Sequence, residues 1–81
     1  MDKILKDLFS FQDIEYKDFT SKLIPTVDKD LIIGVRTPDL RNYAKKLFKE
    51  DEKRTFEFLN NLPHKYYEEN NLHGCLIEQI K

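Results

Sequence analysis

Basic side chains gather in the middle of the chain, where they could contact phosphate groups. Positions 36–54 hold seven Lys or Arg residues and four Asp or Glu residues, so this stretch carries a local charge of +3. Three of the basic residues are spaced four apart, which places them in one row along a helix. Such a row can follow the phosphates of a nucleic acid, although most basic rows on helices are solvated surface. The row consists of Arg41, Lys45 and Lys49.

The turn that precedes this row, Arg36-Thr37-Pro38, could also meet an anion. Thr37 is a preferred capping residue and Pro38 suits the first helical position, so we predict that a helix begins here. The amino end of a helix offers free N–H groups to a phosphate. Asp39, in the first turn, opposes this use because its carboxylate would repel a second negative charge.

Residue types that ligate metals occur near the carboxyl end, but their spacing does not favour a metal site. His73 and Cys75 are two apart and fall on different faces of a helix. Glu69 and His73 are four apart and could reach one ion, yet no third ligand is evident. We therefore predict no metal site, and a structural role for His73.

Two adjacent pairs could suggest acid–base chemistry or base stacking. Glu68 and Glu69 are neighbours and point apart on a helix, so we predict that they lie on a solvated face. Of Tyr66 and Tyr67, one ring is expected to face the core and the other its rim. Neither pair is assigned a catalytic or binding role.

Composition favours one small all-helical domain. The chain has 81 residues, of which 40% are hydrophobic and 36% charged, with only two Gly and three Pro. It is too apolar for a disordered chain and too poor in Gly and Pro for a loop-rich sheet protein. The net charge of −1 points to neither nucleic acid nor membrane, and no apolar run is long enough to span a bilayer. A single cysteine suits a reducing compartment, so we predict a cytoplasmic protein.

Apolar residues at helical spacing predict about five helices joined by short turns. Residues 25–36 form the one long connection, in which Leu31-Ile32-Ile33 is predicted to be a buried extended loop. The fourth helix is expected to point Phe56 and Leu59 inward. The predicted helices cover residues 2–10, residues 14–24 after a cap at Asp13, residues 37–49, residues 51–60, and residues 63–81 starting at Pro63.

The last predicted helix has a long apolar face, and no residue pattern near Lys81 predicts where the helix ends. Leu72, Leu76 and Ile80 recur at intervals of four, with Cys75 on the same side. Consecutive antiparallel helices with short turns are typical of helical repeats, in which each pair needs a neighbour. We therefore expect that the chain is cut from a longer protein, and that this face favours self-association.

Two stretches resemble the amino-terminal part of the DNA alkylation repair enzymes, which are alkylpurine DNA glycosylases built from HEAT-like repeats. They are IIGVRTPDLRNYAKKL and FLNNLPHKYYEENNLHGCLIEQIK, and the likeness covers nearly the whole chain from about residue 13. Its most specific pieces are the pattern Gly34-x-x-Thr37-Pro38-x-x-Arg41 and residues 62–74. The resemblance implies an all-α solenoid that curls around duplex DNA and hydrolyses the glycosidic bond of N-alkylated purines, such as 3-methyladenine and 7-methylguanine. It implies no metal and no other cofactor.

The same resemblance implies where DNA would be contacted. In the family, the loop before the Thr-Pro helix faces the duplex near the lesion. Arg36 is therefore expected to contact phosphate or a groove edge, and the Thr37-Pro38 turn to press on the backbone or on the opposite base. Arg41 matches a basic position of the motif.

The chain departs from the family in its catalytic residues. In the family, the catalytic aspartate and the tryptophans that flank the lesion come from later helices, whereas this sequence contains no Trp. We assign no catalytic residue and predict that residues 1–81 are inactive alone, as a single amino-terminal HEAT-like fragment of a larger repair domain. The alternative is a non-catalytic helical-repeat module for protein interaction, with the basic row as surface decoration.

Overall fold

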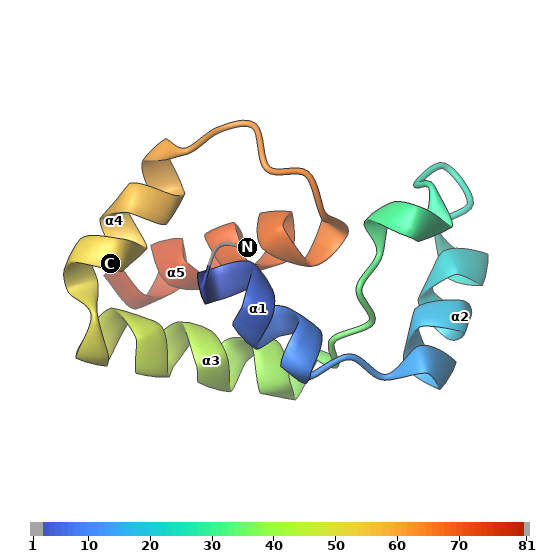
Figure 1. Ribbon diagram of the computed structural model, residues 1–81, viewed down its shortest axis with the longest axis horizontal. Coiled ribbons are helices and arrows are strands. Elements are labelled where there is room, and N and C mark those ends of the chain that lie inside the picture. The colour runs from blue at the N-terminus through green and yellow to red at the C-terminus, as the bar shows by residue number, and fades with distance from the viewer. Residues whose placement is uncertain (1–2, 81) are drawn as a thin grey trace.

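The computed structural model describes residues 3–80, which contain five α-helices and no β-strand (Figure 1). The all-α prediction is confirmed. None of the helices in this range has both the length and the apolar character needed to cross a bilayer. In chain order the elements are α1 (Lys3–Ser10), α2 (Ile14–Leu23), the 3-10 helix η1 (Lys29–Leu31), α3 (Thr37–Glu50), α4 (Glu52–Asn60) and α5 (Tyr67–Ile80).

The core lies between α3 and α5, and α1 packs across both helices (Figure 1). In the view of Figure 1, α3 and α5 both run from right to left, because α4 and the connection after it return the chain to the right before α5 begins. Apolar residues three or four apart on each helix face this core, as the helical spacing predicts. Its buried members are Ile4, Leu8, Ile33, Val35, Leu40, Tyr43, Ala44, Leu47, Phe58, Leu72 and Leu76.

α2 contributes no side chain to this core and lies with η1 at one end of the molecule (Figure 1). Its N-cap is Asp13, as predicted, and the Asp13 carboxylate accepts the backbone N–H of Tyr16 at 3.1 Å. Large apolar side chains of α2 remain accessible to solvent. Ile14 is 60% exposed, Phe19 56% and Leu23 64%.

The long connection before α3 is buried and extended only in its second half. Ile32 and Ile33 are buried as predicted, whereas Leu31 is half-buried and closes the short helix η1. The sequence pattern did not predict η1. It forms because the Asp28 carboxylate caps it by accepting the N–H of Asp30 at 3.0 Å.

Two predicted helix starts need correction. Arg36 is the N-cap of α3, so Thr37 is the first helical residue and its side chain does not cap the helix. α5 begins at Tyr67 instead of Pro63. The N–H groups of Lys65 and Tyr66 donate to the Glu69 carboxylate at 3.2 and 3.0 Å. These hydrogen bonds cap the helix, so that it begins later than predicted.

The inward faces of α4 and α5 also differ from the prediction. In α4, Phe58 is buried and Phe56 is exposed, while Leu59 is half-buried against the core as expected. In α5, Leu72 and Leu76 are fully buried within this chain, so of the predicted open face only Ile80 remains exposed. The chain positions at the outer ends of the first and last predicted helices, residues 2 and 81, lie outside the described residues.

Candidate functional site

Glu68 holds the buried segment that leads into α3. Its side chain is only 1% exposed. The N–H of Ile33 donates to Oε1 at 2.8 Å, and the N–H groups of Gly34 and Val35 donate to Oε2 at 2.8 and 3.3 Å. The prediction that Glu68 and Glu69 lie on a solvated face is therefore wrong, because both carboxylates are buried acceptors for backbone N–H groups that would otherwise lack a partner.

Gly34 fits between the starts of α2 and α5. Its φ is +94°, a conformation that side-chain-bearing residues rarely adopt. Its N–H donates to Glu68, and its carbonyl accepts the N–H of Asp13 at 2.8 Å. A Cβ at this position would lie 2.6 Å from the Asp13 carbonyl oxygen and 2.7 Å from the Lys17 Cβ. Only glycine allows the backbone to pass this closely.

Arg36 lies two residues after Gly34, and its side chain contacts the start of α2. Its Nε donates to Oδ2 of Asp13 at 3.0 Å, and its guanidinium carbon lies 5.0 Å from the centroid of the Tyr16 ring. The backbone N–H of Tyr16, and then the Arg36 side chain, lower the pKa of Asp13 by stabilising its ionised form. The side chain of Arg36 is therefore exposed but oriented.

The four residues predicted to meet DNA share one end of α3. Arg36, Thr37, Pro38 and Arg41 are all exposed, and the first three form one continuous turn. Asp39 is exposed beside them. The structure therefore places all four on the surface.

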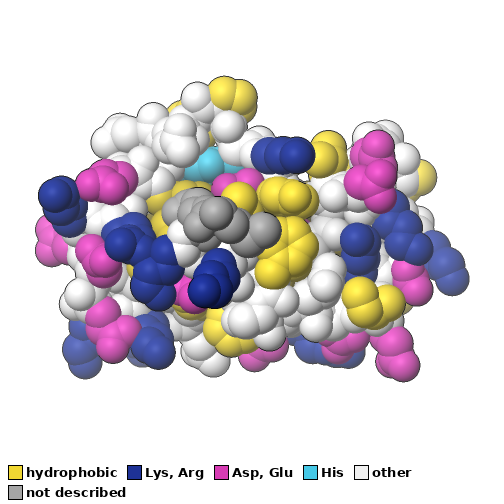
Figure 2. Space-filling model, in the orientation of Figure 1, with side chains coloured by type: hydrophobic (Ala, Val, Ile, Leu, Met, Phe, Trp, Pro, Cys, Tyr) yellow, Lys and Arg dark blue, Asp and Glu magenta, His cyan; other side chains and the backbone are white. Residues whose placement is uncertain are grey.

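The basic row of α3 extends from this turn along the helix. Arg41, Lys45 and Lys49 are exposed, and no acidic side chain among residues 3–80 pairs with them. On the face that Figure 2 shows, basic and acidic side chains alternate instead of forming one patch of a single sign.

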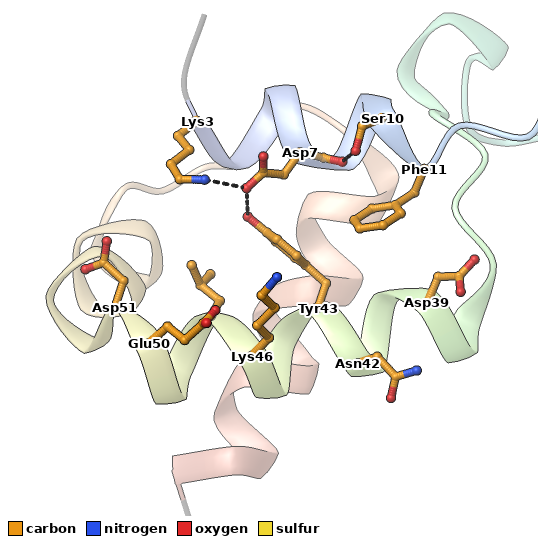
Figure 3. Close-up of a pocket in the computed structure, with 11 residues that line it drawn as sticks. Lys3, Asp7, Ser10, Phe11, Asp39, Asn42, Tyr43, Lys46, Glu50 and Asp51 are labelled. Carbon is orange, nitrogen blue, oxygen red and sulfur yellow. Dashed lines mark hydrogen bonds and ion pairs between the residues drawn. The ribbon is translucent and has the colours of Figure 1, made fainter.

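A cavity of about 540 Å³ lies between α1 and α3, and Asp39, the residue after the turn, lines one end of it (Figure 3). The Tyr43 hydroxyl and the Lys3 ammonium group donate to Oδ2 of Asp7 across it, at 2.8 and 3.0 Å. Burial raises the pKa of Asp7, but these two hydrogen bonds and the positive charges of Lys3 and Arg54 together lower it overall. The cavity is lined by four carboxylates and two lysines, so its charge disfavours phosphate. The acidic residues are Asp7, Asp39, Glu50 and Asp51.

The ring of His73 is hydrogen-bonded to the ring of His64. Nδ1 of His73 lies 3.0 Å from Nε2 of His64, and one nitrogen donates to the other. The His64 ring also stacks on Phe58, with centroids 4.2 Å apart. Burial lowers the pKa of His64, Glu69 opposes this shift, and His73 adds to it. No three His, Cys, Asp or Glu side chains in residues 3–80 are grouped to hold a metal ion.

The adjacent tyrosines pack against the body of the protein. Tyr66 meets Phe9 edge-to-face at 5.4 Å, and both tyrosine rings are half-buried. Neither the tyrosines nor the histidine pair lies in the predicted turn. Sequence reasoning missed two sets of contacts: the pairing of Asp13, predicted only as a helix cap, with Arg36, and the hydrogen bonds of Glu68 to the backbone before Arg36.

Comparison with protein-family models, with curated proteins and with solved structures finds no match to this chain.

Proposed function

We propose that this chain supplies part of the DNA-binding edge of a HEAT-like DNA alkylation repair glycosylase, which excises N-alkylated purines from duplex DNA. The observation that supports this most is that the exposed turn Arg36-Thr37-Pro38 follows a buried, hydrogen-bonded segment. In that segment the Gly34 N–H donates to Glu68, and the Gly34 carbonyl accepts the N–H of Asp13. Binding residues are commonly found on loops that a rigid scaffold positions. An oriented arginine loses less side-chain entropy when it meets a phosphate.

The charges near the turn fit a contact with the phosphate backbone of DNA. Arg36 and Arg41 are exposed at the start of α3, and Lys45 and Lys49 continue the row. Arginine binds phosphate through a planar set of donors, and two of its nitrogens can act together. The Arg36 side chain is 54% exposed although it pairs with Asp13, so a phosphate can reach the guanidinium group.

In this proposal the chain alone does not cleave the glycosidic bond. Cleavage requires a carboxylate and a water molecule held against the sugar. Near the turn, Glu68 is enclosed by backbone N–H groups, and Asp13 is engaged by Arg36 and by the start of α2. Incubation with DNA that contains 7-methylguanine should release no more free base than a buffer control, and release above the control would contradict this part of the proposal.

DNA binding can be tested with two arginines that have matching partners. Arg36 pairs through its Nε with Asp13, the N-cap of α2. Arg54 likewise pairs through its own Nε with Asp51, the N-cap of α4. Arg36→Ala should weaken binding to a labelled duplex and reduce the slope of log K against log salt by roughly 0.9, the value for one phosphate contact. Arg54→Ala removes the same charge and should leave that slope unchanged.

The proposal fails if the chain does not bind duplex DNA at low salt. It also fails if Arg36→Ala and Arg54→Ala weaken binding equally, since only the net charge would then be involved.

A second candidate function is a protein-interaction module, and the exposed apolar side chains of α2 favour it. Ile14, Phe19 and Leu23 leave much of their apolar surface in contact with water. A partner chain or a second copy could cover them, and Ile80 at the end of α5 could join a contact between copies. Light scattering tests self-association: under this candidate, Phe19→Glu or Ile80→Glu should lower the mass of any oligomer that the chain forms.

A further inference from the structure

The buried Glu68 carboxylate holds the backbone segment that leads to Arg36. It accepts hydrogen bonds from the N–H groups of Ile33, Gly34 and Val35, which precede it in the sequence by 35, 34 and 33 positions. Three consecutive N–H groups thus point at one carboxylate, which supplies the acceptor that these buried donors need. Val35 then leads directly to Arg36.

We propose that Glu68 is a positioning residue for the DNA-binding edge, which holds Arg36 in the orientation that meets the duplex. The proposal rests on the proposed function, and it names the residue on which the geometry of that edge depends. Glu68 would touch no DNA, since only 1% of its surface is exposed.

The connection from Glu68 to Arg36 has two routes. The first is covalent, because Val35 is both a hydrogen-bond partner of Glu68 and the residue before Arg36. The second passes through Gly34, whose N–H donates to Glu68 while its carbonyl accepts the N–H of Asp13. Asp13 in turn pairs with Arg36. Both members of the Arg36–Asp13 pair are therefore fixed to the segment that Glu68 holds.

Glu69 offers a matched control in the next position. It is also buried, and its carboxylate also accepts two backbone N–H groups, those of Lys65 and Tyr66. These belong to the connection before α5 and do not lead to the turn. Replacing either glutamate by glutamine removes one charge and substitutes an N–H₂ donor for an acceptor oxygen.

The first experiment measures duplex binding over a range of salt concentrations, at a temperature where both variants remain folded. Glu68→Gln should weaken binding and reduce the salt slope by roughly 0.9, as expected for loss of one oriented phosphate contact. Glu69→Gln should keep the wild-type slope. Equal slopes for wild type and Glu68→Gln, or equal losses in both variants, would overturn the proposal.

A second measurement does not depend on DNA. The Arg36 Nε–H resonance reports its pairing with Asp13, and amide hydrogen exchange at residues 33–35 reports the hydrogen bonds to Glu68. Glu68→Gln should shift that resonance and accelerate that exchange, whereas Glu69→Gln should do neither. An unchanged resonance in Glu68→Gln would overturn the positioning role.

The two readouts separate failure of the function from failure of the inference. If the wild-type chain binds no duplex, the proposed function fails, and the resonance alone decides whether Glu68 positions Arg36. If Glu68→Gln does not fold, Glu68→Asp replaces it, with Glu69→Asp as its control. Aspartate keeps the charge but is one methylene shorter, so it should reproduce the loss in slope and the shifted resonance.

Discussion

Nε of Arg36 lies 3.0 Å from Oδ2 of Asp13, so the arginine of the exposed turn already has a carboxylate partner. The same aspartate caps α2 through its other oxygen, and its backbone N–H donates to Gly34. One residue thus aligns the start of α2 with the turn before α3. A phosphate that approaches Arg36 must compete with Asp13 or share the guanidinium group with it.

Removing the Asp13 carboxylate should weaken DNA binding, because its pairing with Arg36 orients the guanidinium group. Asparagine caps a helix about as well as aspartate, so Asp13→Asn should keep α2 while it replaces the acceptor oxygen of Arg36 with an N–H₂ donor. We expect lower duplex affinity and a shallower salt slope, measured by fluorescence anisotropy. Asp18→Asn is the control, because Asp18 pairs with Lys29 and its loss changes the net charge equally. Equal changes in both variants would mean that net charge alone sets the affinity.

The two glycines should respond in opposite ways to alanine. Gly34→Ala places a Cβ 2.6 Å from the Asp13 carbonyl oxygen at a positive φ. We expect a loss of about 2–5 kcal/mol in the free energy of unfolding, from backbone strain and overpacking together. Gly74 lies in α5 with nothing near its missing Cβ. Gly74→Ala should gain about 0.5–1 kcal/mol.

Urea denaturation of the two glycine variants measures both changes. A Gly34→Ala chain as stable as wild type would mean that the backbone of residues 32–35 can relax away from α2.

The start of α3 gives a test of helix capping. Because Arg36 occupies the N-cap and no side chain caps the helix there, Thr37→Ala should change the free energy of unfolding by less than ~0.5 kcal/mol. Asp51 is a true cap, whose carboxylate accepts the N–H of Arg54 at 3.1 Å. Asp51→Ala should cost about 0.5–2 kcal/mol. Thermal unfolding compares the two, and a larger cost for Thr37→Ala would restore Thr37 as the cap.

The histidine pair predicts a loss of stability at mildly acidic pH. Burial lowers the pKa of His64 below 6.5, so the unfolded chain binds more protons than the folded chain in the window below that value. Stability from this group is complete above pH 6.5 and declines as the pH falls toward the folded pKa. The melting temperature of wild type should therefore fall between about pH 7.5 and pH 5.5.

His64→Gln serves as the control for this effect, since glutamine does not titrate. Its melting temperature should fall less over the same range. Parallel pH profiles for wild type and His64→Gln would show that His64 makes no contribution to the acid sensitivity.

Local patterns predicted most of the helical structure. Apolar residues at helical spacing identified α3, whose buried residues are Leu40, Tyr43, Ala44 and Leu47. Asp13 identified the start of α2. Both signals are local, because helical spacing and capping involve residues only three or four apart. The same local reasoning misplaced the inward face of α4. Phe56 and Phe58 are equally apolar, and only packing against α3 and α5 selects Phe58.

The sequence by itself therefore determined an all-α chain and a turn, Arg36-Thr37-Pro38, that separates a buried segment from a basic helix. Only the tertiary structure decided how that turn is held. Glu68 looked like surface charge because a carboxylate on a helix is normally solvated. Its partners are backbone N–H groups more than thirty residues away, and backbone groups have no signature in the sequence. Burial of residues 33–35 leaves these N–H groups without water, so a distant acceptor has to satisfy them.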